Sequence, residues 1–208
     1  ATLIIFAFRA TPGTGEGMRW FQIDRLGFDA EFYGALDQIS STLGIAGLWL
    51  LAATISRRPI AWTLFWLTVL FTLLSLPSLG LYYGVHNWTE ANFGFGAQTI
   101  ALIDTAASSP FAQLSMIPLL TLIAIYAPAG RRATWFALMA SLMNLALVAG
   151  QLQTKYLNQI FHVDRGKYDE LGWLMITVLI IGFALPVLAI ALLGGRIAAN
   201  RTASAAGR

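Results

Sequence analysis

Long apolar runs constrain this chain more than any other feature of its sequence. We searched for stretches of about 20 apolar residues, the length a helix needs to cross the hydrocarbon core of a bilayer. The expected spans cover residues 1–25 (interrupted), 32–55, 60–84, 97–127, 133–157 and 171–193. The sequence therefore predicts an all-α integral membrane protein with six transmembrane helices.

Composition excludes a soluble globular enzyme. Of the 208 residues, 57% are apolar and only 11% are charged, whereas about 25% of a soluble domain is charged. The chain has no cysteine and two histidines, and it has neither an HExxH motif nor a serine nucleophile with a plausible histidine partner. We therefore expect no enzymatic activity, no metal and no cofactor.

The charged residues fall mostly in the short connections between apolar runs, so the net charge of +3 does not indicate a nucleic-acid partner. Residues 56–59, 127–132 and 194–208 carry seven arginines and no acidic residue. Short basic loops stay on the cytoplasmic side, which predicts a cytoplasmic C-terminus. We expect one six-helix membrane unit over residues 1–193 and a basic, flexible cytoplasmic tail over 194–208. The abrupt apolar start predicts that the chain is the interior of a longer protein.

Polar residues are segregated among the expected spans. The third and sixth spans carry no ionisable side chain, whereas the other four carry charges or amides. This pattern predicts that spans one, two, four and five line an aqueous or substrate cavity, while spans three and six form an apolar outer brace.

Five polar residues are candidates for a substrate site: Arg9, Asp37, Asp104, Gln113 and Asn144. An ion inside the bilayer costs from about 2.5 kcal/mol upward, so Arg9 and Asp104 must find water, a partner or a ligand. Asn144 lies about 18 Å along its span, near the midplane. It could bind a ligand or only bridge two helices. Asp37 could face the cavity or the outer interface.

The backbone is expected to be irregular at two places. Residues 10–17 contain one proline and three glycines, which loosen a helix. This run is either a flexible helix end near the surface or a discontinuous helix that lines a cavity. Pro110 and Pro118 predict bends in the fourth span.

Several motifs in these helices resemble those of the folate–biopterin transporter family, a branch of the major facilitator superfamily. The matching segments are Arg9-Ala10-Thr11-Pro12, Phe32-Tyr33-Gly34, Asp104, Ser109-Pro110-Phe111, Gln113 to Pro118, Tyr126-Ala127-Pro128, Arg132 to Leu138, Ser141 to Leu145 and Tyr168 to Gly172. The resemblance implies a twelve-helix transporter of two six-helix halves, of which this chain looks like helices seven to twelve. In that fold the first, second, fourth and fifth helices of each half line the cavity.

The resemblance implies a secondary transporter for an organic anion such as folate or another pteridine, working by alternating access with a second six-helix half. Arg9 would attract a substrate carboxylate, Asp104 would be a counter-ion or proton carrier, and Asn144 and Gln113 would orient the ligand. The expected partners are the lipid bilayer, this substrate, and a second half, a homodimer partner or a larger membrane complex. The alternative is a non-transporting six-helix subunit bound to such a complex.

Overall fold

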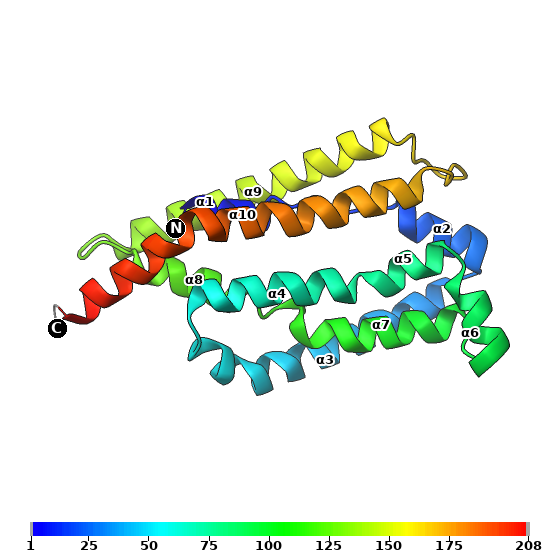
Figure 1. Ribbon diagram of the computed structural model, residues 1–208, viewed down its shortest axis with the longest axis horizontal. Helices are drawn as coiled ribbons and strands as arrows, with labels where there is room; N and C mark the ends of the chain where they lie inside the picture. Colours follow the sequence, from blue (N-terminus) through cyan, green and yellow to red (C-terminus); the bar gives the residue numbers. More distant parts are fainter. Residues whose placement is uncertain (1, 207–208) are drawn as a thin grey trace.

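The computed structural model describes the backbone of residues 2–206 and the side chains of residues 2–193. Within these residues the chain is helical, with no named strand and one isolated bridge in a loop. The helices are α1 (Thr2–Arg9), α2 (Gly17–Leu26), α3 (Ala30–Ser56), α4 (Ile60–Leu74), α5 (Leu76–Tyr82), α6 (Val85–Phe93), α7 (Ala97–Ala112), α8 (Met116–Ile125), α9 (Arg132–Ile160) and α10 (Leu171–Ala206). They form an elongated bundle in which the long helices lie side by side (Figure 1).

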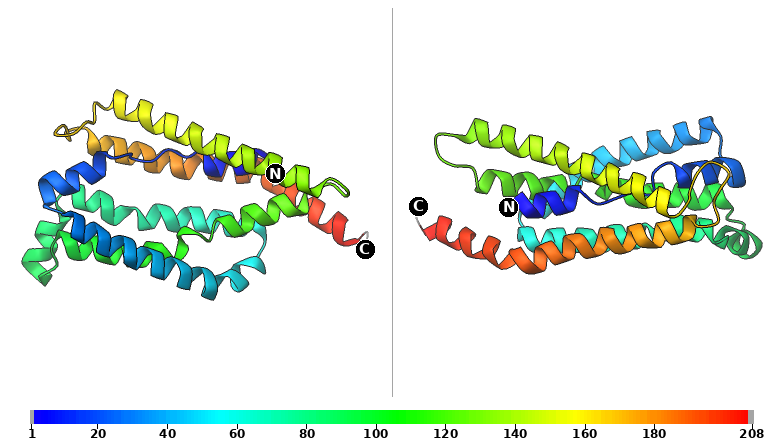
Figure 2. Two further views of the ribbon diagram at one scale, coloured as in Figure 1. Left: turned by 180° about the vertical axis from the view of Figure 1, so that it is seen from behind. Right: turned by 90° about the horizontal axis from the view of Figure 1, so that it is seen from above.

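Five of the expected spans are confirmed as helical segments long and apolar enough to cross a membrane. These segments are Ala30–Ser56, Ile60–Tyr82, Ala97–Ile125, Arg132–Ile160 and Leu171–Leu193. The first expected span is a broken helix too short in either part to qualify, so its crossing of the bilayer stays a prediction. It nevertheless runs along the bundle, from the end that holds α8 to the end that holds α6 (Figure 2).

The break in the first segment falls where proline and glycine predicted irregular backbone. Helix α1 ends at Arg9, an extended stretch follows, and α2 begins at Gly17. Gly15 has a φ of 65°, a left-handed conformation that favours glycine. The stretch between the two helices is packed against α9, because a side chain at Gly150 would lie 2.9 Å from the carbonyl oxygen of Thr11.

Two further spans are interrupted. The fourth divides into α7 and α8 around residues 113–115, between Pro110 and Pro118, which confirms the predicted bends. The third divides at Ser75, between α4 and α5, which the sequence analysis did not foresee. Pro77 explains this break, because proline has no N–H to donate to the preceding turn.

Close packing of small residues joins α3 to α7. A Cβ atom at Gly47 would lie 2.3 Å from the carbonyl oxygen of Pro110, and one at Gly44 would lie 3.5 Å from that of Ser109. Two apolar clusters then hold the bundle together. One lies around Ile4, Leu64 and Leu122, and the other around Phe28 and Leu174, near the end that holds α2.

Helix α10 continues past the expected end of its span and is helical as far as Ala206. The side chains beyond residue 193 lie outside the described part, so the expected flexibility of a tail over 194–208 stays a prediction. The start of α1 and the C-terminal end of α10 lie at the same end of the bundle (Figure 1).

Candidate functional site

A cavity of about 340 Å³ lies beside Asp104 of α7. The side chain is half-buried, and its Oδ2 accepts a hydrogen bond of 2.9 Å from the hydroxyl of Ser78 in α5. Its Oδ1 is buried and has no hydrogen-bond partner among the described residues. Thr14 of the broken segment and Ser108 of α7 also line this cavity. Asp104 therefore presents an unpaired oxygen inside the helical bundle.

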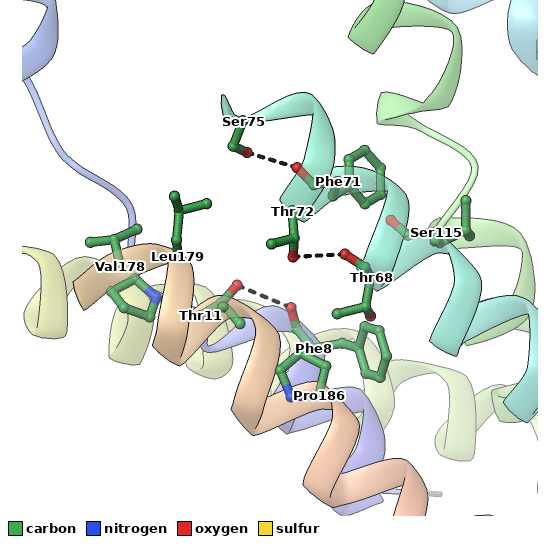
Figure 3. A pocket seen from close by; sticks show the side chains of 13 residues that line it. Phe8, Thr11, Thr68, Phe71, Thr72, Ser75, Ser115, Val178, Leu179 and Pro186 are labelled. Atoms are coloured by element: carbon green, nitrogen blue, oxygen red, sulfur yellow. Dashed lines mark hydrogen bonds between the residues drawn. The ribbon is translucent and has the colours of Figure 1, made fainter. Parts of the chain in front are cut away.

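A second cavity of about 260 Å³ adjoins the first and shares Phe71, Ser75, Val178 and Leu179 with it. It reaches Phe8 of α1 and Thr11 just after that helix, and it is otherwise lined by α4, α10 and Ser115, the residue before α8 (Figure 3). The lining of both cavities is apolar apart from hydroxyl groups and Asp104. Together they form one hydroxyl-lined space between the broken segment and the third, fourth and sixth spans.

The location of these two cavities differs from what the polar-residue pattern predicted for the third and sixth spans. The third and sixth spans were expected to form an apolar outer brace, yet both line the interior cavities. The third span contributes Thr68, Thr72, Ser75 and Ser78, spaced four, three and three residues apart. That spacing places the hydroxyls on one helix face and was visible in the sequence. It was missed because the search considered only charged and amide side chains.

The side chain of Arg9 does not pair with that of Asp104. It is half-buried at the last residue of α1, and its Nε is buried without a hydrogen-bond partner among the described residues. No ion pair between Arg9 and Asp104 occurs in that part of the chain. The guanidinium therefore has one buried donor without a hydrogen-bond partner among the described residues.

The other three predicted site residues lie on the outside of the bundle. Asp37 of α3, Gln113 after α7 and Asn144 of α9 are all exposed. The structure thus separates the five candidates into two half-buried ionic residues and three exposed polar ones. Their roles in substrate binding stay predictions.

Side chains of α9 satisfy the backbone of the broken segment. Thr154 Oγ1 accepts a 2.9 Å hydrogen bond from the N–H of Gly13, and Gln153 Nε2 donates a 2.9 Å bond to the carbonyl of Ala10. Asn158 Nδ2 donates to the carbonyl of Thr14 at 3.3 Å. Backbone groups that lack helical partners at membrane depth need such replacements. These bonds account for three polar residues of the fifth span, Gln153, Thr154 and Asn158.

An open pocket of about 570 Å³ lies beyond these contacts, between the broken segment and the end of α9. Glu16, Trp20, Lys155, His162 and Lys167 line it, and charges of both signs are therefore mixed there. Lys155 is exposed, as expected of a lysine near the end of a span. The mixed charges give this pocket no clear preference for an anion or a cation.

The loop between α9 and α10 contacts α2 through a hydrogen bond and an ion pair, outside the membrane-spanning helices. The phenol of Tyr168 donates a hydrogen bond to Asp24, and Arg165 forms a 3.7 Å ion pair with the same carboxylate. Partial removal from water raises the pKa of Tyr168 above its usual 10.0, and the bond to Asp24 raises that pKa further. The phenol therefore stays protonated, and the bond stays intact, across the physiological pH range.

Among the described residues, no three His, Asp or Glu side chains gather as metal ligands.

Comparison with known proteins identifies the family and a relative of the chain. The family model described as the BT1 family matches residues 1–205. A folate-biopterin transporter of Synechocystis sp. (strain ATCC 27184 / PCC 6803 / Kazusa) is 33% identical over 181 residues, with 84% of this chain and 35% of that protein covered. No solved structure matches the chain.

The fold and these matches define an integral, multi-pass membrane protein related to a folate-biopterin transporter. The chain belongs to the BT1 family, which confirms the resemblance seen in its motifs. It spans about a third of the length of the curated relative it matches. That relative is named as a transporter, which agrees with the expectation that the chain is not an enzyme.

Proposed function

We propose that the chain is one six-helix half of a secondary transporter for an organic anion. The observation that carries this proposal is a polar stripe exposed along α9, formed by Asn144, Gln151 and Lys155. These residues are seven and four apart, so they share one helix face. Asn144 lies about 18 Å from the start of α9, at the depth of the hydrocarbon core. Polar groups at that depth face a bundle interior or a water-filled cavity.

A second half of the transporter would cover this polar face. Asp37 is exposed on α3, and Gln113 is exposed at the break between α7 and α8. The curated relative is long enough to contain a second unit of this size, because the chain covers 35% of it. In this arrangement the two halves rock about a site between them and open it to each side in turn. The first segment crosses the bilayer as a sixth, discontinuous span.

The proposed substrate class is an anionic pteridine such as folate. Support comes from the name of the relative, a folate-biopterin transporter, and from the unpaired buried Nε of Arg9. A guanidinium pairs well with a substrate carboxylate, because its N–H donors match the two carboxylate oxygens. Asn144 and Gln113 would supply amide groups that orient the ring. The basic loops and the C-terminus would lie on the cytoplasmic side.

Uptake of radiolabelled folate by proteoliposomes that contain the full-length protein tests this proposal. We expect Arg9→Ala to weaken the apparent affinity for folate about tenfold or more, the usual loss when a hydrogen bond to a charged group is removed. Arg57→Ala is the matched control, because Arg57 is an exposed arginine of a basic loop. Equal affinity in both variants would remove Arg9 from the site. Absence of uptake, with stoichiometric co-purification in a larger complex, would favour the structural-subunit alternative.

A further inference from the structure

Both lysines of the chain line the open pocket at the end of α9. Lys155 belongs to α9 and Lys167 to the loop that follows it, and the sequence has no other lysine. Neither ammonium group forms a hydrogen bond or an ion pair within the described part of the chain. Each therefore offers three N–H donors and a positive charge to a molecule in the pocket.

Two carboxylates line the same pocket and balance the charge of the lysines. Glu16 lies just before α2, and Asp164 lies in the loop between α9 and α10. Neither carboxylate forms an ion pair with Lys155 or Lys167 among the described residues. Asp164 Oδ1 accepts a 2.8 Å hydrogen bond from the backbone N–H of Arg165, whereas Glu16 accepts none on its side chain from those residues. Opposite charges are therefore held apart around the pocket, where one molecule can bridge them.

An aromatic ring and two amides also line the pocket. The indole of Trp20 is half-buried, because it packs against the second apolar cluster, and it borders the pocket. Gln151 and Gln159 are exposed, and each amide offers both donors and an acceptor. His162, the fifth titratable residue of the lining, lies 3.7 Å from Glu170. The pocket therefore suits a planar molecule that brings both hydrogen-bond donors and negative charge.

The pocket continues the polar stripe of α9 to one end of the bundle. Gln151 and Lys155 belong to both the stripe and the pocket, and Lys155 lies about 16 Å along the helix from Asn144. The connection between α9 and α10, which holds Lys167, lies at the end of the bundle away from the C-terminal end of α10 (Figure 1). In the proposed orientation this end faces the outside, so a solute meets the pocket before it reaches Asn144.

We propose that this pocket is an outer binding site for a carboxylated pteridine, in which Lys155 and Lys167 bind the carboxylates and Glu16 binds the ring. A pteridine with an amino group beside a ring N–H presents two donors, which match the two oxygens of a carboxylate. The ring lies against Trp20, and its carboxylated tail reaches the lysines. The inference rests on the proposed function for the identity of the solute.

Folate and biopterin provide a matched pair of probes for this arrangement. Both contain the pteridine ring, but only folate carries carboxylates. Glu16 and Trp20 therefore serve both compounds, whereas Lys155 and Lys167 serve folate alone. The two lysines are thus specificity residues, and their loss should affect one compound and spare the other.

Protection of the lysines from a water-soluble amine-acylating reagent tests the site in the purified full-length protein. We expect folate at about ten times its dissociation constant to slow acylation of Lys155 and Lys167 about tenfold, because the free pocket falls by that factor. Biopterin should protect them less. Arg131→Lys places a control lysine just before α9, at the other end of that helix. Equal acylation with and without folate, or equal protection by both compounds, would overturn the proposal.

Uptake by proteoliposomes gives a second test that separates charge from structure. We expect the double variant Lys155→Gln, Lys167→Gln to raise the KM for folate about fivefold or more, since an exposed ion pair changes an equilibrium by up to about fivefold. Its KM for biopterin and its maximal rates should stay within about twofold of the wild type. Replacing both lysines with arginine keeps the charge and should restore the KM for folate. An equal change for both compounds would contradict the role of the lysines.

The two tests fail independently of the proposed function. If the wild type does not transport folate, the proposed function is refuted, while protection of the lysines by folate still supports the pocket. If the wild type transports folate and the double variant keeps the same KM, the pocket assignment is overturned and the proposed function stands.

Glu16→Gln provides the complementary measurement. It removes the charge that pairs with the ring and leaves both lysines in place, so protection by folate and by biopterin should each require about fivefold more ligand. Glu31→Gln is the matched control, because Glu31 is an exposed carboxylate in the first turn of α3. Unchanged protection in Glu16→Gln would overturn the assignment of the ring to this side of the pocket.

Discussion

Gly47 shows how one residue sets the distance between two membrane helices. Its Cα faces the backbone of α7 so closely that an added Cβ would lie 2.4 Å from the Cα of Pro110. Small residues permit this approach, and van der Waals packing then replaces the hydrophobic driving force that lipid does not supply. The same contact holds α7 in place just beyond Asp104.

Replacing Gly47 should destabilise the protein through this contact. We expect Gly47→Ala to lower the free energy of unfolding by about 1–3 kcal/mol, the usual cost of overpacking a well-packed site. Gly34→Ala on the same helix is the matched control, because nothing lies within 4 Å of a Cβ there. Thermal unfolding of both variants in detergent measures the difference. Equal unfolding temperatures would show that α3 and α7 are not in close contact.

At the scale of elements, the broken first segment depends on α9. The Gly13 N–H and the carbonyls of Ala10 and Thr14 have no helical partner, and side chains of α9 bond to them instead. Each such bond is worth about 0.6 kcal/mol on average between membrane helices, and up to about 1.7. The segment is therefore held by several weak contacts, which would suit a region that changes shape in the proposed transport cycle.

Thr154→Val should loosen this segment while preserving side-chain shape. The substitution leaves the N–H of Gly13 without its acceptor, so we expect faster amide hydrogen exchange in peptides that cover residues 10–16. Thr121→Val is the control, because the Thr121 hydroxyl donates to the carbonyl of Ile117 within its own helix. Hydrogen-exchange mass spectrometry measures both. The attachment of the segment to α9 would be refuted if the two variants exchanged alike.

Hydropathy predicted the spans well because lipid requires long apolar helices, and Pro110 and Pro118 predicted the bend between α7 and α8. Helix α6 was missed because it is short and lies in a connection between spans. The cavity around Ser78 was missed because serine and threonine hydroxyls satisfy themselves within a helix and leave no charge pattern. The exposure of Asp37 and Asn144 depends on three-dimensional packing, which residue spacing alone does not give.

At the scale of the whole molecule, the chain has two kinds of polar surface. One is recessed within the bundle and consists of the hydroxyl groups and the Asp104 carboxylate that line the two partly open cavities. The other is open and runs along α9 and α3. A protein that ended at this bundle would expose the second surface to lipid at a high cost. The open polar face therefore supports the proposed second half, which would enclose water and substrate between the two.

Labelling of two adjacent residues of α9 tests this conclusion most directly. Asn144 belongs to the polar stripe, whereas Leu145 is 60% exposed and belongs to a leucine stripe with Leu138 and Leu152. The two positions differ by about 1.5 Å in depth and about 100° around the helix. They therefore share a depth but face different surroundings.

The measurement uses Asn144→Cys and Leu145→Cys in the reconstituted full-length protein, a membrane-impermeant thiol reagent, and mass spectrometry to locate the label. This part of the chain has no cysteine of its own. We expect rapid labelling of Asn144→Cys that folate slows, and no labelling of Leu145→Cys. No labelling at either position, or labelling of Leu145→Cys alone, would contradict a substrate cavity on this face.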